Sequence, residues 1–334
     1  MRVRFEKTST SYNSLATVAD RWTPTHPSNT IAKATNSTSI VTDDRFVENA
    51  SFLRVKNITL GYNLPVRQIT KDTKARLFIS LQNLITWTSY SGCAIRSHLE
   101  YFRATNMDFV KVQYEIAVPR LENIKSPKDW AKIPVYKKDF FAPQLDVIEA
   151  LVKELKSEAL ILPTVYSPLS LAQQTIGSDA VQHIKQDPDA VSIGFKAITE
   201  SILNYMNEAI RIGVDGFYIS TQGGNSMFFD NGILFEKVIV PYDKIISQEA
   251  SDKALMNILH VCDYGEAYYR QISQFATYPG SIINAPNQLL DGTPIKPQEV
   301  QSTFKRPVMG GLDRLGILAK GSILSIIILV DPYC

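Results

Sequence analysis

Short apolar runs alternate with longer stretches of helical periodicity between residues 95 and 322. Six of these runs are predicted strands, and they span residues 108–114, 159–165, 214–220, 255–262, 281–285 and 307–312. The stretches between them place apolar residues at steps of three and four, as at Phe195, Ile198 and Ile202, which predicts amphipathic helices. Strands joined by helical crossovers form parallel sheets, and the length of this region favours a (β/α)8 barrel over an open sheet.

The composition limits the classes of protein that need to be considered. The chain has 334 residues, of which 45% are apolar, so it is long enough for one large barrel or two smaller domains. Its net charge of +2 argues against a nucleic-acid-binding protein that relies on bulk charge. No apolar run reaches the roughly 18 residues of a transmembrane helix. The first residues lack the apolar core of a signal peptide, so we expect the barrel part to be cytoplasmic.

Residues 1–92 and 323–334 do not follow the alternation of strands and helices. The first segment is rich in Ser, Thr and Asn, and residues 76–87 alternate between apolar and polar, which predicts a strand exposed on one side. Residues 51–62 are a second strand candidate, so we expect a short antiparallel β segment. The run at 323–334 is too short to span a bilayer and is interpreted as an unrelated apolar tail. The predicted domains are therefore 1–92, 93–322 and 323–334.

His260 and Cys262 are the strongest candidates for a metal site. They lie two residues apart in the predicted strand that ends at Asp263, so both side chains point to the same side, near the carboxyl end of that strand. One imidazole and one thiolate suit a soft tetrahedral metal such as zinc. Zinc takes three or four ligands and a free cysteine is often simply buried, so a core position for Cys262 is the alternative. The other cysteines, Cys93 and Cys334, are distant in sequence, which fits a reducing compartment without a disulfide framework.

Two further pairs are candidates for substrate binding. Thr221 and Gln222 follow a predicted strand in a loop that lacks the glycine spacing of a dinucleotide site, and we expect this loop to lie on the active-site face. Asp313 and Arg314 follow the last predicted strand and could bind an acidic group, with a local ion pair as the alternative. His183 stands among polar residues of a predicted helix, which indicates a solvated surface histidine.

Five short runs within residues 95–322 form a recognisable set. They are Met107–Lys111, Ser167–Ala172, Gly213–Phe217, Leu259–Cys262 and Met309–Arg314. With these runs the region resembles the uroporphyrinogen decarboxylase superfamily, which also contains cobalamin:coenzyme M methyltransferases of the MtaA type. The resemblance implies a TIM barrel, and by its pattern the first and last strands are lacking here. The expected fold class is therefore α/β, an incomplete (β/α)8 barrel preceded by a short antiparallel β segment.

The two branches of this superfamily imply different sites. In the decarboxylase branch Asp108 matches the aspartate that stabilises the protonated pyrrole ring, with a strand-start residue that caps local backbone as the alternative. That branch has a tyrosine and a serine where Gln174 and Thr221 stand in this chain, so its site is poorly matched. In the methyltransferase branch His260 and Cys262 match the His-x-Cys half of a zinc site. The third ligand of that site is a cysteine on the last strand.

The methyltransferase branch implies zinc as the cofactor, a thiol as the acceptor, and a methylated corrinoid on a partner protein as the donor. We therefore expect a protein most like a zinc-dependent, corrinoid-linked methyltransferase, impaired by its missing strands. A uroporphyrinogen decarboxylase acting on a tetrapyrrole is the second interpretation. Neither interpretation involves nucleic acid or a membrane span.

The first 92 residues have a different set of motifs. They are Arg21–Pro24, Pro27–Asn29, Asp44–Tyr62, Gln82–Thr86 and Tyr90–Gly92. These runs resemble the C-terminal end of SusC-type TonB-dependent outer-membrane receptors. A few strands cannot close a barrel in lipid, so we do not expect this segment to transport anything by itself. The third interpretation is a receptor fragment without enzymatic activity, and we interpret the whole chain as a junction of two unrelated coding fragments.

Overall fold

The computed structural model of the chain describes residues 2–3, 47–48, 52–64, 75–105, 107–113, 117–225, 228–229, 232–263 and 268–310. The candidate residues Asp313 and Arg314 and the tail 323–334 lie outside the described residues. The chain divides into two compact units, Met1–Cys93 and Ala94–Cys334, and each unit is considered by itself.

The first unit contains antiparallel strand pairs. β1 (Arg2–Val3) pairs with β2 (Val47–Glu48). The long strands β3 (Phe52–Leu64) and β4 (Ala75–Thr88) pair along their whole length, with an irregularity in register between Val55 and Asn57. The helix α1 (Ser89–Thr105) follows β4 directly along the chain and is not among the elements predicted from the sequence.

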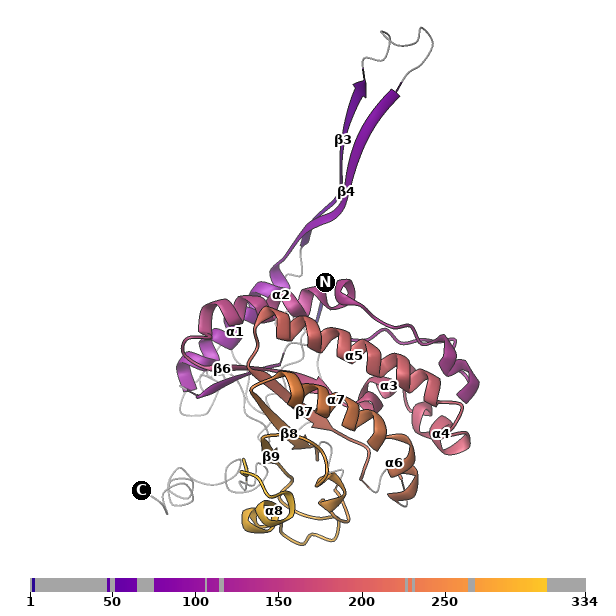
Figure 1. Cartoon of the computed structure of the whole chain (residues 1–334), viewed down its shortest axis with the longest axis vertical. Helices are drawn as coiled ribbons and strands as arrows, with labels where there is room; N and C mark the ends of the chain where they lie inside the picture. The colour runs from indigo at the N-terminus through magenta and orange to yellow at the C-terminus, as the bar shows by residue number, and fades with distance from the viewer. Residues whose placement is uncertain are drawn as a thin grey trace, which may run out of the picture. The chain divides into compact units, whose positions relative to one another are not determined.

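The second unit is built on a parallel sheet whose spatial order equals its sequence order (Figure 1). Its strands are β5 (Phe109–Val112), β6 (Leu160–Tyr166), β7 (Gly216–Thr221), β8 (Met256–Val261) and β9 (Ile282–Asn284). A parallel bridge between Ile283 and Val308 continues the sheet at the sixth predicted strand. The unit is therefore an α/β fold with a five-stranded parallel sheet, an order and direction found in part of a (β/α)8 barrel.

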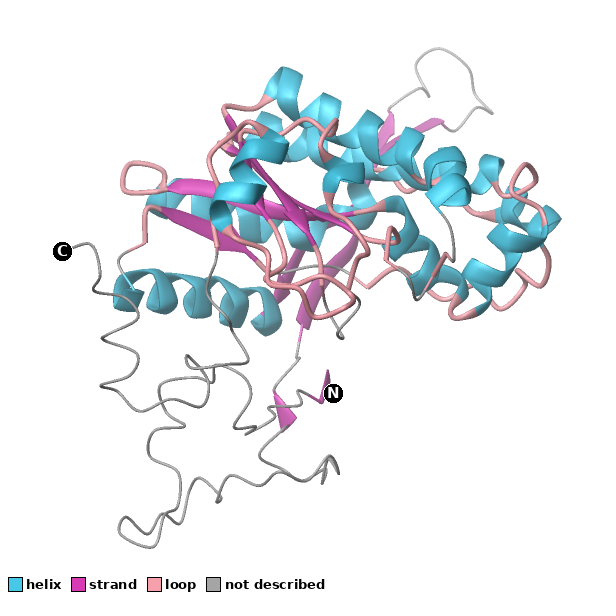
Figure 2. Ribbon diagram, turned by 90° about the horizontal axis from the view of Figure 1, so that it is seen from below, coloured by secondary structure: helices cyan, strands magenta, loops and turns pink. Residues whose placement is uncertain are grey.

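Helices connect the strands and cover one face of the sheet. They are α2 (Lys138–Leu155), α3 (Pro168–Ile176), α4 (Asp179–Gln186), α5 (Ser192–Ile212), α6 (Gly232–Val238), α7 (Val240–Lys253) and α8 (Pro297–Phe304). α2, α5 and α7 lie side by side along the sheet (Figure 1), and Figure 2 shows helices packed along the strands. α5 ends at Gly213, whose φ of 108° is left-handed and suits a residue without a side chain. Within the described part of the chain, no helix is long and apolar enough to cross a membrane.

Side chains along the strands alternate between two apolar clusters. The larger cluster lies between sheet and helices and includes Val110, Ile161, Phe217 and Leu259. The smaller cluster, on the opposite face, consists of Leu162, Tyr218 and Ile258, with Phe109, Met256, Ile282 and Met309 packed against it. Because successive strand residues point to opposite faces, the smaller cluster defines which side chains face the inside of the curved sheet.

His183 corrects one expectation from the sequence. It is not a solvated surface residue, because its side chain is buried and its Nδ1 accepts a hydrogen bond from Trp130 Nε1 at 3.1 Å. Trp130 is itself fully buried in a short 3-10 helix, Pro127–Lys132, that packs against α4. The polar neighbours of His183 in sequence gave no sign of this partner, which lies far away along the chain.

Candidate active site

Polar side chains gather at the carboxyl ends of the strands, on the face that carries the smaller cluster. They are Lys111 on β5, Tyr218 on β7, Gln222 just after β7, His260 on β8, Cys262 just after β8, and Asn284 at the end of β9. We call this set the polar network. His260 follows Ile258 by two residues and therefore shares its inward side of β8. In parallel α/β barrels the carboxyl ends of the strands are where active sites are built.

Asn284 fixes the orientation of the His260 ring. Its Oδ1 lies 2.5 Å from His260 Nδ1 and accepts a second hydrogen bond from the Tyr218 hydroxyl at 3.1 Å. Its Nδ2 donates to the carbonyl of Met309 at 2.7 Å, which sets the direction of the amide. An amide oxygen can only accept, so His260 Nδ1 bears the proton, and in the neutral ring the lone pair is on Nε2.

Cys262 is held by groups from two other segments. Its thiol is half-buried, and Gln222 Nε2 donates toward its Sγ at 3.7 Å. The Gln222 carbonyl oxygen in turn accepts a hydrogen bond from Ser170 Oγ at 2.7 Å, so the amide is oriented. The hydroxyl of the buried Tyr269 donates to the carbonyl of Cys262 at 2.5 Å and fixes the backbone there.

The hydroxyl of Tyr218 is a neutral group within the polar network. Burial raises the pKa of Tyr218 strongly, and negative charge at Cys262 and Asp263 raises it further. The phenol therefore remains a hydrogen-bond donor to Asn284 across the physiological pH range. The Lys111 ammonium lies 4.4 Å from the centroid of the Tyr218 ring, in a cation–π arrangement that brings a positive charge to the network.

The predicted substrate residues Thr221 and Gln222 have different positions. Thr221 is buried, and its hydroxyl donates to the backbone carbonyl of His260 at 3.1 Å, so it ties β7 to β8. Strand alternation puts Thr221 on the same side as Phe217 and Ile219, toward the helices. The structure thus brings Gln222 into the polar network and leaves Thr221 outside it.

Asp108 is not brought together with the polar network. It is exposed and precedes β5, at the amino end of the sheet, whereas the network lies at the carboxyl ends. Its backbone carbonyl accepts a hydrogen bond from the amide of Leu160 at 3.1 Å, as expected of a residue that begins a strand. A catalytic role for Asp108 therefore stays a prediction that the geometry does not support.

The donor set at His260 and Cys262 suits two positions of a zinc site. A histidine that binds a metal through one ring nitrogen usually donates its other N–H to a carbonyl or carboxylate, and Asn284 fills that role for His260. Among the described residues, no group of three or more His, Cys, Asp and Glu side chains is arranged to hold a metal ion. The two residues therefore fit half of the site, and a third protein ligand is not found in the part of the chain that is described.

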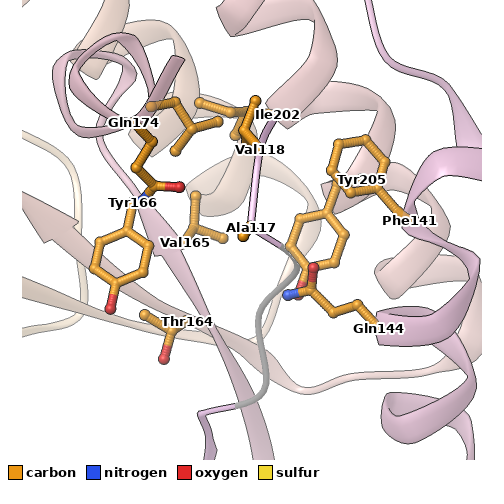
Figure 3. Close-up of a pocket in the computed structure, with 11 residues that line it drawn as sticks. Ala117, Val118, Phe141, Gln144, Thr164, Val165, Tyr166, Gln174, Ile202 and Tyr205 are labelled. Atoms are coloured by element: carbon orange, nitrogen blue, oxygen red, sulfur yellow. The ribbon is translucent and has the colours of Figure 1, made fainter. Parts of the chain in front are cut away.

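A cavity of about 470 Å³ lies at the carboxyl end of β6 (Figure 3). Its walls include Phe141 and Gln144 of α2, Val165 and Tyr166 of β6, and Ile202 and Tyr205 of α5. Figure 3 shows the Gln144 amide directed at the Tyr205 hydroxyl, to which it donates at 2.9 Å. Gln174, which stands at the position of the decarboxylase tyrosine, also lines this cavity.

Several of these residues were missed by reasoning from the sequence. Lys111, Tyr218 and Asn284 come from three strands that are far apart along the chain, and only the folded sheet brings them together. A weak signal was present, since each is a polar or amphipathic residue inside an otherwise apolar predicted strand. Such residues near the carboxyl end of a barrel strand are candidates for function.

Comparisons with known proteins give two separate similarities. The chain is 35% identical over 82 residues to TonB-dependent receptor P3 of Formosa agariphila, and 32% identical over 83 residues to TonB-dependent receptor P26 of the same organism. Each match spans 24% of this chain and only 8% of the receptor's length.

The second similarity concerns the fold of the larger unit. The structure of a methyltransferase from Methanosarcina mazei superposes with a TM-score of 0.53, over 66% of this chain and 69% of that chain, at 12% sequence identity. At this identity the likeness is one of fold. Residues 103–325 match the family model described as uroporphyrinogen decarboxylase (URO-D), which confirms the resemblance inferred from the sequence runs. The chain therefore belongs to the uroporphyrinogen decarboxylase family.

Proposed function

We propose that this member of the family is a zinc-dependent methyltransferase that moves a methyl group from a corrinoid donor to the sulfur of a thiol. The observation that carries the proposal is the pair formed by His260, on the inner side of β8, and Cys262, just after that strand, with Asn284 orienting the imidazole. An imidazole and a thiolate at the carboxyl ends of the barrel strands are the ligand types that zinc prefers. Among the described residues, no comparable arrangement of polar side chains surrounds Asp108 for the decarboxylase chemistry.

His260 and Cys262 would hold the metal, and zinc bound there would lower the pKa of a coordinated acceptor thiol so that it is a thiolate near neutral pH. The thiol proton leaves to solvent. The acceptor sulfur then forms a bond to the methyl carbon while the bond between that carbon and the donor breaks, and the electron pair of the broken bond leaves with the donor.

The side chains around this pair have supporting tasks in the proposal. Asn284 keeps the Nε2 lone pair of His260 directed away from its own amide. Gln222 donates toward the sulfur of Cys262 and so helps to hold this side chain in position. The ammonium of Lys111, which lies over the Tyr218 ring, adds positive charge to the polar network.

Cobalt titration tests the proposal without requiring activity. The full chain is stripped of metal by chelation and titrated with Co²⁺, whose bonds to thiolate sulfur give a charge-transfer band in the near ultraviolet. We expect saturation at one equivalent, loss of the band in Cys262→Ala, and weaker binding by at least tenfold in His260→Ala. Cys93→Ser is the matched control, and it should titrate like the unaltered chain. A band that survives in Cys262→Ala would overturn the proposal.

A further inference from the structure

The cavity at β6 lies beyond the point where the described pairing of β5 with β6 ends. β5 and β6 are paired from Phe109–Leu160 to Val112–Pro163, and β6 is paired with β7 only from Thr164 onward. The Thr164 hydroxyl still reaches the carbonyl of Val112 at 3.0 Å, and beyond this contact the edge of β6 is bounded by helices α2 and α5. The space between these elements is the cavity.

The walls of the cavity are mostly apolar and contain no charged side chain among the described lining residues. Val118, Phe141, Val165, Leu171 and Ile202 supply hydrocarbon surface. The polar groups in the walls are all neutral: two glutamine amides, two tyrosine hydroxyls and one threonine hydroxyl. Among the described lining residues an anionic group would find no counter-charge, whereas an uncharged group with an amide or hydroxyl would find hydrogen-bonding partners. The volume lies within the range typical of small-molecule sites.

The cavity is connected to the polar network through side chains. Tyr166 lines the cavity, and its hydroxyl accepts a hydrogen bond from Gln113 Nε2 at 3.3 Å. Gln113 in turn accepts a hydrogen bond from the ammonium of Lys111, which lies over the Tyr218 ring. Tyr218 and His260 share the oxygen of Asn284. A chain of contacting side chains therefore joins the polar network to Tyr166 in the wall of the cavity.

We propose that this cavity binds the non-reacting part of the acceptor thiol, and that this part is uncharged and mainly apolar, such as an aromatic or branched aliphatic group with one amide. The assignment to the acceptor rests on the proposed function. The neutral side chains of the described walls distinguish this acceptor from thiols whose other end is a sulfonate or a carboxylate.

Ligand-observed NMR on the full chain tests the proposal with two matched probes, N-benzylacetamide and phenylacetate, which differ mainly in charge. We expect saturation transfer to N-benzylacetamide and none to phenylacetate. Leu171→Trp and Val118→Trp place an indole in the cavity from two different segments, and each should reduce the signal at least fivefold. Leu255→Trp adds the same indole at a residue that is 78% exposed and does not line the cavity, so it should bind like the unaltered chain.

Competition between the probe and two thiols on the zinc-loaded chain then tests whether the cavity binds part of a thiol acceptor. Benzyl mercaptan should displace N-benzylacetamide, and 3-mercaptopropionate should not. Equal binding of phenylacetate, or full binding in both filling variants, would overturn the inference. Cobalt binding is measured in the same samples. Cobalt binding without probe binding would overturn this inference alone. Probe binding without cobalt binding would overturn the proposed function, and with it the assignment of the cavity to a thiol.

Discussion

Asn284 orients two side chains through a single oxygen atom. Tyr218 and His260 both donate to it, and the amide cannot rotate without losing its own bond to the carbonyl of Met309. Partners of this kind hold a metal-binding histidine in one tautomer and one orientation, and their removal weakens metal binding. Asn284 is therefore a positioning residue for His260 rather than a ligand.

Replacing Asn284 by leucine should weaken Co²⁺ binding by about 10- to 100-fold while leaving the thiolate band in place at saturation. The reason is that both ligands remain and only the orientation of the imidazole is lost. Asn284→Asp should restore most of the affinity, because a carboxylate accepts the same hydrogen bond. Asn123→Leu, at an exposed turn, is the control. An Asn284→Leu chain with unchanged affinity would show that the amide has no positioning role.

Asp243 on α7 is a second residue with an unusual setting. It is buried, its Oδ2 accepts a hydrogen bond from the Tyr278 hydroxyl at 3.1 Å, and its Oδ1 has no hydrogen-bond partner among the described residues. Burial raises the pKa of Asp243 to about 8, although the hydrogen bond from Tyr278 acts in the opposite direction. The folded protein therefore holds this carboxyl group protonated at neutral pH.

This protonation predicts the pH dependence of stability. An unfolded chain releases the Asp243 proton near pH 4, whereas the folded chain keeps it up to about pH 8. Between these values the folded state binds one more proton than the unfolded state. The free energy of unfolding should therefore fall by about 1.4 kcal/mol for each unit by which the pH rises. Asp243→Asn should remove this contribution from the slope and be more stable than the unaltered chain at pH 8, as measured by urea unfolding from pH 4.5 to pH 8. Asp252→Asn, on the exposed side of α7, should keep the slope. Parallel slopes for Asp243→Asn and the unaltered chain would contradict the account.

At the scale of elements, β7 and β8 pack so closely that one position excludes a side chain. Gly216 begins β7, and a Cβ there would lie 1.5 Å from the carbonyl oxygen of Met256 on β8. That oxygen belongs to the backbone of a paired strand, so neither side can yield without breaking the register. The close approach keeps β7 and β8 paired up to the network residues at their carboxyl ends.

Gly216→Ala should therefore lower the free energy of unfolding by about 3 kcal/mol, in the range of an overpacked core. Gly232→Ala is the matched control, because a Cβ at Gly232 would meet nothing within 4 Å. That variant should change stability by less than about 1 kcal/mol. Chemical denaturation of both variants provides the comparison, and equal stabilities would contradict the packing argument.

The elements of the larger unit could be predicted from the sequence better than the site could. Apolar runs located every strand of the parallel sheet to within a few residues, and Gly213 marked the end of α5, because these signals depend on neighbouring residues alone. The helix α1 was missed, and the partners of His183 and His260 were missed as well. The hydrogen bond from Trp130 to His183 and the bond of His260 to Asn284 join residues from different elements, and no local pattern encodes such pairs.

At the scale of the whole molecule, the family model and the receptor matches cover unequal shares of the chain. The family model covers residues 103–325, within the unit Ala94–Cys334. The receptor matches cover only 24% of the chain and 8% of each receptor. The family name alone would suggest decarboxylation, yet Asp108 lies at the opposite end of the strands from the polar network, and the described cavity walls are neutral.

The full chain should therefore not decarboxylate uroporphyrinogen. A substrate with several carboxylates needs cationic side chains to hold it, and Lys111 is the one cation among the described members of the polar network. Incubation of the reduced tetrapyrrole with the zinc-loaded chain, followed by chromatography of the oxidised products, should give only the starting compound. Products with fewer carboxyl groups would favour the decarboxylase over the methyltransferase as the activity of this chain.

The central claim is that the imidazole of His260 and the sulfur of Cys262 bind one metal ion together. X-ray absorption at the zinc edge of the full chain, loaded with one equivalent of zinc, measures this directly. The account predicts one sulfur neighbour at about 2.3 Å and a nitrogen neighbour at about 2.0 Å, with the sulfur lost in Cys262→Ala and the imidazole signature lost in His260→Ala. A spectrum with only oxygen and nitrogen neighbours, or one that neither substitution alters, would contradict it.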